Sequence, residues 1–163
     1  MSETIQRNMQ KPTGAFVGAS WAALFIGSGA YLFGLWNADM QLNEKGYYVT
    51  LLLYGLFASV SLQKSVRDKL AGIHVTGIYY GICWVSIIIS LVLLGVGLWN
   101  ATFEISAKGF YAMAYLLALF ASIAVQKNIR DIDLFSEEKL SHESKSMPLS
   151  EEPVSRVHKV VPR

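Results

Sequence analysis

The sequence GLWNADMQLNEKGYYVTLLLYGLFASVSLQKSVRD at residues 34–68 recurs as GLWNATFEISAKGFYAMAYLLALFASIAVQKNIRD at residues 97–131. The two copies align without a gap at an offset of 63 residues, and 17 of the 35 positions are identical. Unrelated apolar segments of this composition would match at only about four positions. The chain therefore contains an internal duplication, and its architecture follows from what one copy forms.

Long uncharged runs overlap each copy. Residues 12–38 and 70–103 contain no Asp, Glu, Lys or Arg, and each run exceeds the roughly 20 apolar residues that cross a bilayer. Two shorter uncharged runs, residues 46–63 and 109–126, reach roughly 27 Å as helices, which is close to the hydrocarbon thickness. Their alternative, a buried helix in a soluble core, does not suit such apolar neighbours. With 53% hydrophobic and 16% charged residues, the chain is predicted to be an all-α membrane protein with four transmembrane helices.

Each copy holds two spans, so both copies enter the membrane in the same direction. We expect them to be related by an axis along the membrane normal. This predicts two tandem helical hairpins in parallel repeat, residues 14–68 and 69–131, in contrast to the inverted repeats of many transporters. The flanking segments are a short tail at residues 1–13 and a tail at residues 132–163. The second tail is rich in Ser, Glu and Lys, contains prolines, and is predicted to be disordered.

Lysine and arginine are distributed unevenly between the two sides of the predicted bundle. The two flanking tails, the connection between the hairpins and the end of the fourth span carry twelve of the 14 basic residues, whereas the hairpin tips carry only Lys45 and Lys108. The positive-inside rule therefore places both termini in the cytoplasm and the tips outside.

The first repeated motif lies at the hairpin tips. Trp36-Asn37 ends one long span and Trp99-Asn100 ends the other. An indole can lie at headgroup level, and an Asn amide can cap carbonyl groups that a helix end leaves unpaired. The return helix then begins with Lys-Gly-(Tyr/Phe)-Tyr, in which the Lys can snorkel and the aromatic rings can lie at the membrane interface. Anchoring explains this motif without a ligand, and binding at the tips is the alternative.

The second repeated motif, Gln-Lys-x-(Val/Ile)-Arg-Asp, ends each return helix at residues 63–68 and 126–131. Cations there complement the carboxyl end of the helix and anionic lipid headgroups. The motif is either a topology anchor or a pair of related docking patches for a lipid or a partner protein. The candidate interfacial residues from both motifs are Trp36, Asn37, Lys45, Gly46, Tyr48, Gln63, Lys64, Arg67, Asp68, Trp99, Asn100, Lys108, Gly109, Tyr111, Gln126, Lys127, Arg130 and Asp131.

Several features of catalytic, metal-binding and proton-transporting proteins are missing from the sequence. No ionisable residue falls near the middle of a predicted span, which disfavours proton-coupled transport. The HExxH, CxxC, GxSxG and P-loop patterns do not occur, and His74, His142 and His158 lack the spacing of metal ligands. We therefore expect no enzymatic activity, no catalytic residue, no cofactor or metal site, and no nucleic-acid partner.

Small residues recur at four-residue spacing in three of the spans. Such spacing lets helix backbones approach closely, so it predicts a packed bundle. The same faces could also serve a homo-oligomer or a membrane protein partner within the bilayer. The residues with this spacing include Gly14, Gly18 and Ala22, Ala23 and Gly27, Ala30 and Gly34, Gly77 and Gly81, and Ala114, Ala118 and Ser122.

The duplicated Gly-Leu-Trp-Asn-Ala, Lys-Gly-(Tyr/Phe)-Tyr and Gln-Lys-x-(Val/Ile)-Arg-Asp motifs closely resemble those of the YiaA/YiaB family of bacterial inner membrane proteins. The resemblance covers about residues 14–131 and implies an inner-membrane location with the two-helix domain as the unit. It brings no established activity or catalytic residue to carry over. We expect a non-enzymatic structural or interaction protein. The alternative is a small oligomeric permease or channel, its path lined by Asn37, Asn100, Gln63, Gln126 and small residues.

Overall fold

The computed structural model describes residues 12–146, and side chains within residues 12–141. These residues form four helices: α1 (Gly14–Asn37), α2 (Leu42–Leu70), α3 (Gly77–Asn100) and α4 (Ile105–Ser146). All four are long and apolar enough to cross a membrane. The predicted all-α fold with four spans is therefore confirmed. The predictions for residues 1–11 and 147–163 lie outside the described part of the chain.

Local hydrogen bonds account for where the helices begin. The Phe16 backbone N–H donates to Thr13 Oγ1 over 3.3 Å, which caps the first turn of α1. At the start of α2, the backbone N–H of Gln41 donates to the Glu44 carboxylate over 3.0 Å. This is the reciprocal bond of a capping box, in which the third helical residue reaches back to the cap.

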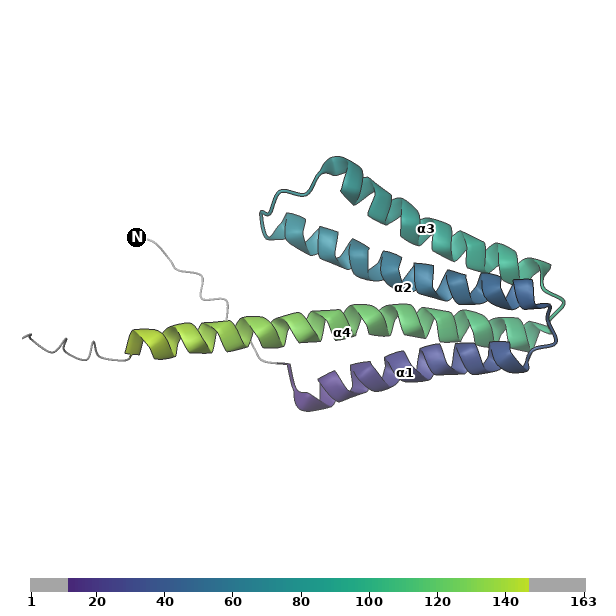
Figure 1. Ribbon diagram of the computed structural model, residues 1–163, viewed down its shortest axis with the longest axis horizontal. Coiled ribbons are helices and arrows are strands. Elements are labelled where there is room, and N and C mark those ends of the chain that lie inside the picture. The colour runs from purple at the N-terminus through teal and green to yellow at the C-terminus, as the bar shows by residue number, and fades with distance from the viewer. Residues whose placement is uncertain (1–11, 147–163) are drawn as a thin grey trace, which may run out of the picture.

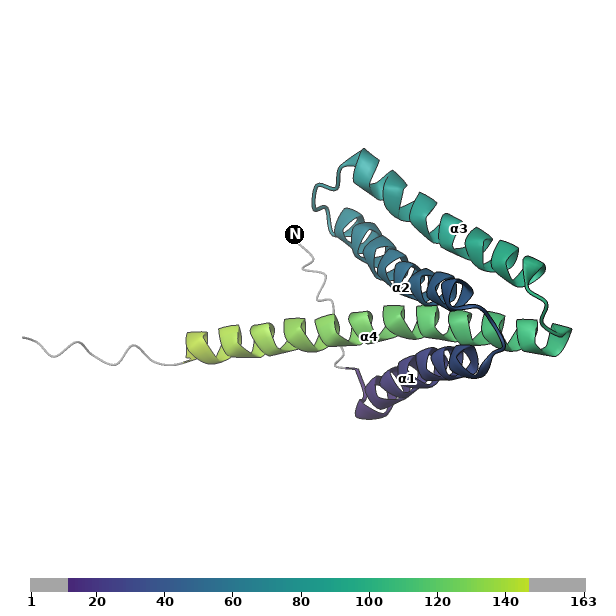
Figure 2. The same cartoon turned by 45° about the vertical axis from the view of Figure 1, so that its right-hand side comes forward.

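The helices are arranged in the order α3, α2, α4, α1, as Figures 1 and 2 show from two directions. The most extensive packing joins α1 to α4 and α2 to α3, and the next most extensive joins α2 to α4. The two helices of the first hairpin touch each other much less. The principal packing partner of α1 therefore belongs to the other copy of the repeat.

A pseudo-twofold axis runs between α2 and α4. Ser59 of α2 and Ser122 of α4 are equivalent residues of the two copies, and their hydroxyl oxygens lie 3.0 Å apart. The equivalent glycines Gly34 and Gly97 also have equivalent neighbours. A Cβ at Gly34 would meet the rings of residues 110 and 111, and one at Gly97 would meet those of residues 47 and 48. The parallel relation between the copies that the even number of spans predicted is thus present in the packing.

The core is a cluster of tyrosines and leucines in the half of the bundle that contains the α1–α2 and α3–α4 connections, which we call the tip end. Tyr31 and Tyr115 are completely buried. Each donates its hydroxyl proton to a backbone carbonyl of α2, Tyr31 to Tyr48 and Tyr115 to Leu51, both over 3.2 Å. These bonds satisfy the polar ends of buried aromatic side chains and join α1 and α4 to α2.

The opposite end of the bundle, which contains the α2–α3 connection, is called the loop end below. There α2 turns into the connection at Gly72, which has a φ of 76° that favours glycine. Toward the loop end α2 diverges from α4, as both views show. The two Gln-Lys-x-(Val/Ile)-Arg-Asp motifs lie on these two diverging helices, at residues 63–68 of α2 and 126–131 of α4.

Helix α4 extends well past the end of the repeat. The sequence predicted disorder from residue 132, but residues 132–146 continue α4 as helix, so this part of the prediction is wrong. The segment contains no Gly or Pro before Pro148, and its Glu and Lys residues are good helix formers. Because α4 is already formed at Asp131, these residues only propagate a helix and need not nucleate one.

Candidate functional site

The tip motif closes the carboxyl ends of α1 and α3 in the same way in both copies. Asn37 Nδ2 donates to the Phe33 carbonyl and Asn100 Nδ2 to the Val96 carbonyl, each over 2.8 Å. These bonds satisfy carbonyl groups near helix ends.

The repeated lysines bind the same helix ends from the following helix. Lys45 Nζ donates to the Trp36 carbonyl over 2.9 Å, and Lys108 Nζ donates to the Trp99 carbonyl over 3.3 Å. A cation at the carboxyl end of a helix also complements the helix dipole. Both indoles are more than four-fifths exposed, so they are available to the membrane interface.

Two further residues of the tip motif lie in the core. The sequence interpretation put Tyr48 and Tyr111 at the membrane interface, but both side chains are buried, and their rings stack with centroids 6.5 Å apart. Gly46 and Gly109 are exposed, and a Cβ at either position would meet no atom within 4 Å. The tyrosines pack inward because the pseudo-twofold axis brings the equivalent positions together. Their position in the sequence, at the start of a helix, does not indicate this packing.

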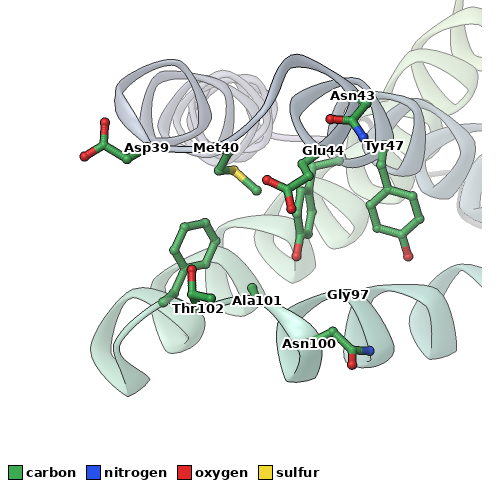
Figure 3. Close-up of a pocket in the computed structure, with 11 residues that line it drawn as sticks. Asp39, Met40, Asn43, Glu44, Tyr47, Gly97, Asn100, Ala101 and Thr102 are labelled. Atoms are coloured by element: carbon green, nitrogen blue, oxygen red, sulfur yellow. The ribbon is translucent and has the colours of Figure 1, made fainter.

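A small polar pocket of about 280 Å³ lies at the tip end between the two connections. Figure 3 shows Glu44 directed between the two connections, whereas Asp39 and Asn100 point away from it. Glu44 already accepts the Gln41 N–H, and Asn100 already caps α3. The polar groups of this pocket therefore do not converge on one ligand position.

The loop-end motif places its charges in short ion pairs along each helix. Arg67 bonds Asp68 through Nε and Nη2, with the shorter distance 2.7 Å, and Arg130 bonds Asp131 in the same way at 2.9 Å. Lys127 Nζ lies 3.6 Å from the Asp131 carboxylate. A guanidinium group carries five N–H donors, and within residues 12–141 the two Nη1 groups have no acceptor.

An apolar groove of about 490 Å³ separates α2 from α4 at the loop end, with α3 along one side. It brings together Gln63 and Arg67 of the first copy with Lys127 and Arg130 of the second. Of the other loop-end candidates, Lys64, Asp68, Gln126 and Asp131 do not line it. The remaining lining residues are Ser59, Leu62, Val66, Leu70, Ile87, Leu91, Leu116, Leu119, Phe120 and Ile123.

The Gln residues of both loop-end motifs carry a buried side-chain oxygen. Gln63 Oε1 and Gln126 Oε1 are both enclosed, and neither receives a hydrogen bond from the described residues. Gln63 lines the groove and Gln126 does not, so the enclosed oxygen is a feature of the repeated motif and is not open to a molecule in the groove.

Sequence reasoning missed the walls of the groove and one buried polar contact. In the sequence, Ile87 and Leu91 are simply apolar residues of a span, and no neighbouring motif predicts that they line a groove. Asn128 is buried and donates to Ser20 Oγ over 3.0 Å, joining α4 to α1. The position of Asn128 near the end of a span could have indicated this buried contact. It was missed because the two copies differ at this position, so it is not part of the repeated motif.

Within the described part of the chain, no group of three or more His, Cys, Asp or Glu residues could hold a metal ion. Cys83 is buried in α3, at the position equivalent to Ser20 of the first copy. The groove can bind an elongated apolar molecule with a polar end, since its lining is apolar except at the mouth.

Comparisons with known proteins agree with the duplicated architecture. The family model described as the yiaA/B two helix domain matches residues 16–68 and again residues 79–131. The chain is 60% identical over 117 residues to the inner membrane protein YiaA of Escherichia coli (strain K12), which covers 72% of this chain and 81% of that protein. It is 34% identical over 66 residues to the uncharacterized membrane protein YubF of Bacillus subtilis (strain 168), covering 40% of this chain and 76% of that protein.

No solved structure matches the chain significantly. The family assignment therefore rests on the doubled domain match and on the identity to curated relatives. The chain, a multi-pass membrane protein with two copies of the domain in tandem, belongs to the YiaA/YiaB two-helix domain family.

Proposed function

We propose that the chain is a non-enzymatic interaction protein of the bacterial inner membrane, with both termini in the cytoplasm. Its similarity to a protein named for the inner membrane supports this location. The excess of basic residues outside the hairpin tips supports the orientation, because such residues are retained on the cytoplasmic side. The loop end of the bundle then faces the cytoplasm.

The groove between α2 and α4 is the observation that carries the proposal. Several of its lining side chains are exposed, with Phe120 70% accessible, so the groove opens laterally toward the lipid. Its cations lie at one end, where the headgroup region of the cytoplasmic leaflet would be. A lateral, one-ended groove suits binding of another membrane component.

The centre of the bundle argues for binding and against conduction. Ser59 and Ser122 are in contact on the pseudo-twofold axis, and Tyr31 and Tyr115 fill the tip half of the core. A conduction path through the bundle would have to displace these side chains. It would run from the tip end, at Asn37 and Asn100, to the loop end, at Gln63 and Gln126. We therefore assign the proposed role to the groove.

The test combines cross-linking with flux. A photoreactive residue at Phe120, on the groove, is expected to give an adduct of defined mass in native membranes. The same residue at Phe57, the equivalent position of the first copy, is 72% exposed but does not line the groove, and should give no defined adduct.

Purified protein in liposomes should leave the permeability to small solutes at the level of empty liposomes. Solute flux above that level, lost in the Gln63→Leu/Gln126→Leu double variant, would contradict the proposal and support the permease alternative. Equal labelling from residues 57 and 120 would also contradict it.

A further inference from the structure

The ligand class of the groove can be inferred from its shape and charge. We propose that the groove binds one anionic phospholipid of the cytoplasmic leaflet, with an acyl chain between α2, α3 and α4 and the phosphate at Arg67, Lys127 and Arg130. This inference rests on the proposed function, because it names the membrane component that the groove holds.

The depth of the groove is apolar and suits an acyl chain. Ten of its fourteen lining residues are Leu, Ile, Val, Phe or Ser, and they come from three different helices. From Ser59 to Arg67 the groove follows α2 over eight residues, or about 12 Å along the helix axis. A lipid tail running along α2 would place its headgroup at the level of Arg67.

The mouth carries a surplus of one positive charge, since its three cations are paired with two carboxylates. Arg67, Lys127 and Arg130 line the groove, and no acidic residue does. Asp68 and Asp131 bind the Nε and Nη2 groups of the two arginines from outside the lining, which holds both guanidinium groups in place. Among the described residues, neither Nη1 group has a hydrogen-bond acceptor. Lys127 is more than half exposed and can turn toward a phosphate.

The two copies of the repeat contribute unlike parts of this site. Arg67 and Arg130 are equivalent residues 63 positions apart, yet both line the same groove. Lys127 joins them, whereas its equivalent, Lys64, lies outside. The doubled motif thus supplies three cations to the lining of one groove, an arrangement that one copy alone does not have.

The charge at the mouth of the groove decides the probe. Phosphatidylglycerol supplies an anionic phosphate headgroup, and phosphatidylcholine of the same acyl chains is the zwitterionic control without net charge.

Native mass spectrometry of the full-length detergent-solubilised protein tests the proposal. At equal concentrations, the protein should retain one phosphatidylglycerol in clear preference to phosphatidylcholine. The Arg67→Gln/Lys127→Gln/Arg130→Gln variant should lose at least about tenfold in retention, since each cation near an anionic headgroup contributes roughly fivefold.

A matched variant controls for total charge. Lys64→Gln/Lys69→Gln/Lys139→Gln removes the same number of charges from exposed positions outside the groove, and should retain phosphatidylglycerol like the parent chain. Equal loss in both variants, or equal retention of the two lipids by the parent chain, would overturn the proposal.

The acyl-chain part has its own pair of variants. Leu116→Trp fills the groove and should reduce retention, whereas Leu53→Trp changes the equivalent lipid-facing residue outside it and should not. Equal retention in these two variants would overturn the placement of the chain. If the protein shows no lipid selectivity, but liposomes remain inert and residue 120 gives a defined adduct, only this inference is defeated. Solute flux through the liposomes would defeat the proposed function itself.

Discussion

Ser59 and Ser122 share a hydrogen bond of 3.0 Å between their hydroxyl oxygens, although they are separated by 63 residues, the period of the internal repeat. Equivalent residues of two copies can meet in this way only at the symmetry axis that relates the copies. The contact therefore locates the pseudo-twofold axis between α2 and α4.

This contact predicts a specific cross-link. In a Cys83→Ser background, Ser59→Cys with Ser122→Cys should form a disulfide under mild oxidation, because the two side chains are already in contact. After cleavage at a protease site inserted in residues 71–76, the two halves should remain joined on a non-reducing gel. The Phe57→Cys/Phe120→Cys pair, with both side chains exposed, should separate. If this control pair cross-linked as efficiently, the axis would be misplaced.

Gly27 is predicted to be the small residue on which the packing of α1 depends. A Cβ there would lie 2.9 Å from the Ala118 backbone nitrogen and 3.1 Å from the Ala114 carbonyl oxygen, so α1 or α4 would have to shift. Gly27→Ala should lower the free energy of unfolding in micelles by roughly 1–3 kcal/mol. Gly29→Ala, at a position with nothing within 4 Å, should leave it unchanged or slightly raised. The reverse order would exclude the α1–α4 contact described above.

The buried pair formed by Asn128 and Ser20 should couple α4 to α1 energetically. In a double-mutant cycle with Asn128→Ala and Ser20→Ala, we expect a coupling free energy of about 0.6 kcal/mol, which is typical of hydrogen bonds between membrane helices. Denaturant titration of the four proteins in one detergent measures it. Pairing Asn128→Ala with Thr50→Ala, near the other end of the bundle, should give additive effects. Strict additivity in the Ser20 cycle would show that the bond is not formed.

The orientation predicts the behaviour of reporter fusions. A reporter active only in the periplasm should be silent when fused after Ser146, because the proposed orientation places the side rich in basic residues in the cytoplasm. The same reporter inserted after Asp39, at a hairpin tip, should be active. Activity at Ser146 with silence at Asp39 would reverse the orientation and would move the groove mouth to the outer leaflet.

The site was only partly predictable from the sequence. Asn37 and Lys45 bind carbonyl groups at the carboxyl end of α1. The end of the uncharged run in the sequence already predicts this helix end. Tyr48 looked like an interfacial anchor, since aromatic residues near a span end usually are, but it stacks on its equivalent in the core. Ile87 and Leu91 carry no local sign of a groove, because a wall is formed only when α3 lies beside α2.

The length of α4 could not be predicted because two tendencies oppose each other after Asp131. The polar composition after Asp131 indicated a chain without a core to bury, which is the usual reason for disorder. Continuation from an existing helix opposes that tendency, since the cost of nucleation has already been met within the bundle. Composition alone does not show whether disorder or propagation of the helix prevails.

By itself, the sequence determined that this chain has four spans, that they form two copies of one hairpin, and that the copies are parallel, because uncharged run length and repeat period are properties of the linear chain. Only the tertiary structure decided that α1 pairs with α4 and α2 with α3, and that three loop-end cations from both copies line one groove. Hydropathy cannot choose among partners, because in a bilayer lipid is as apolar as another helix. The choice depends on close fit, such as Gly27 against Ala114 and Ala118, which exists only once the helices are in contact.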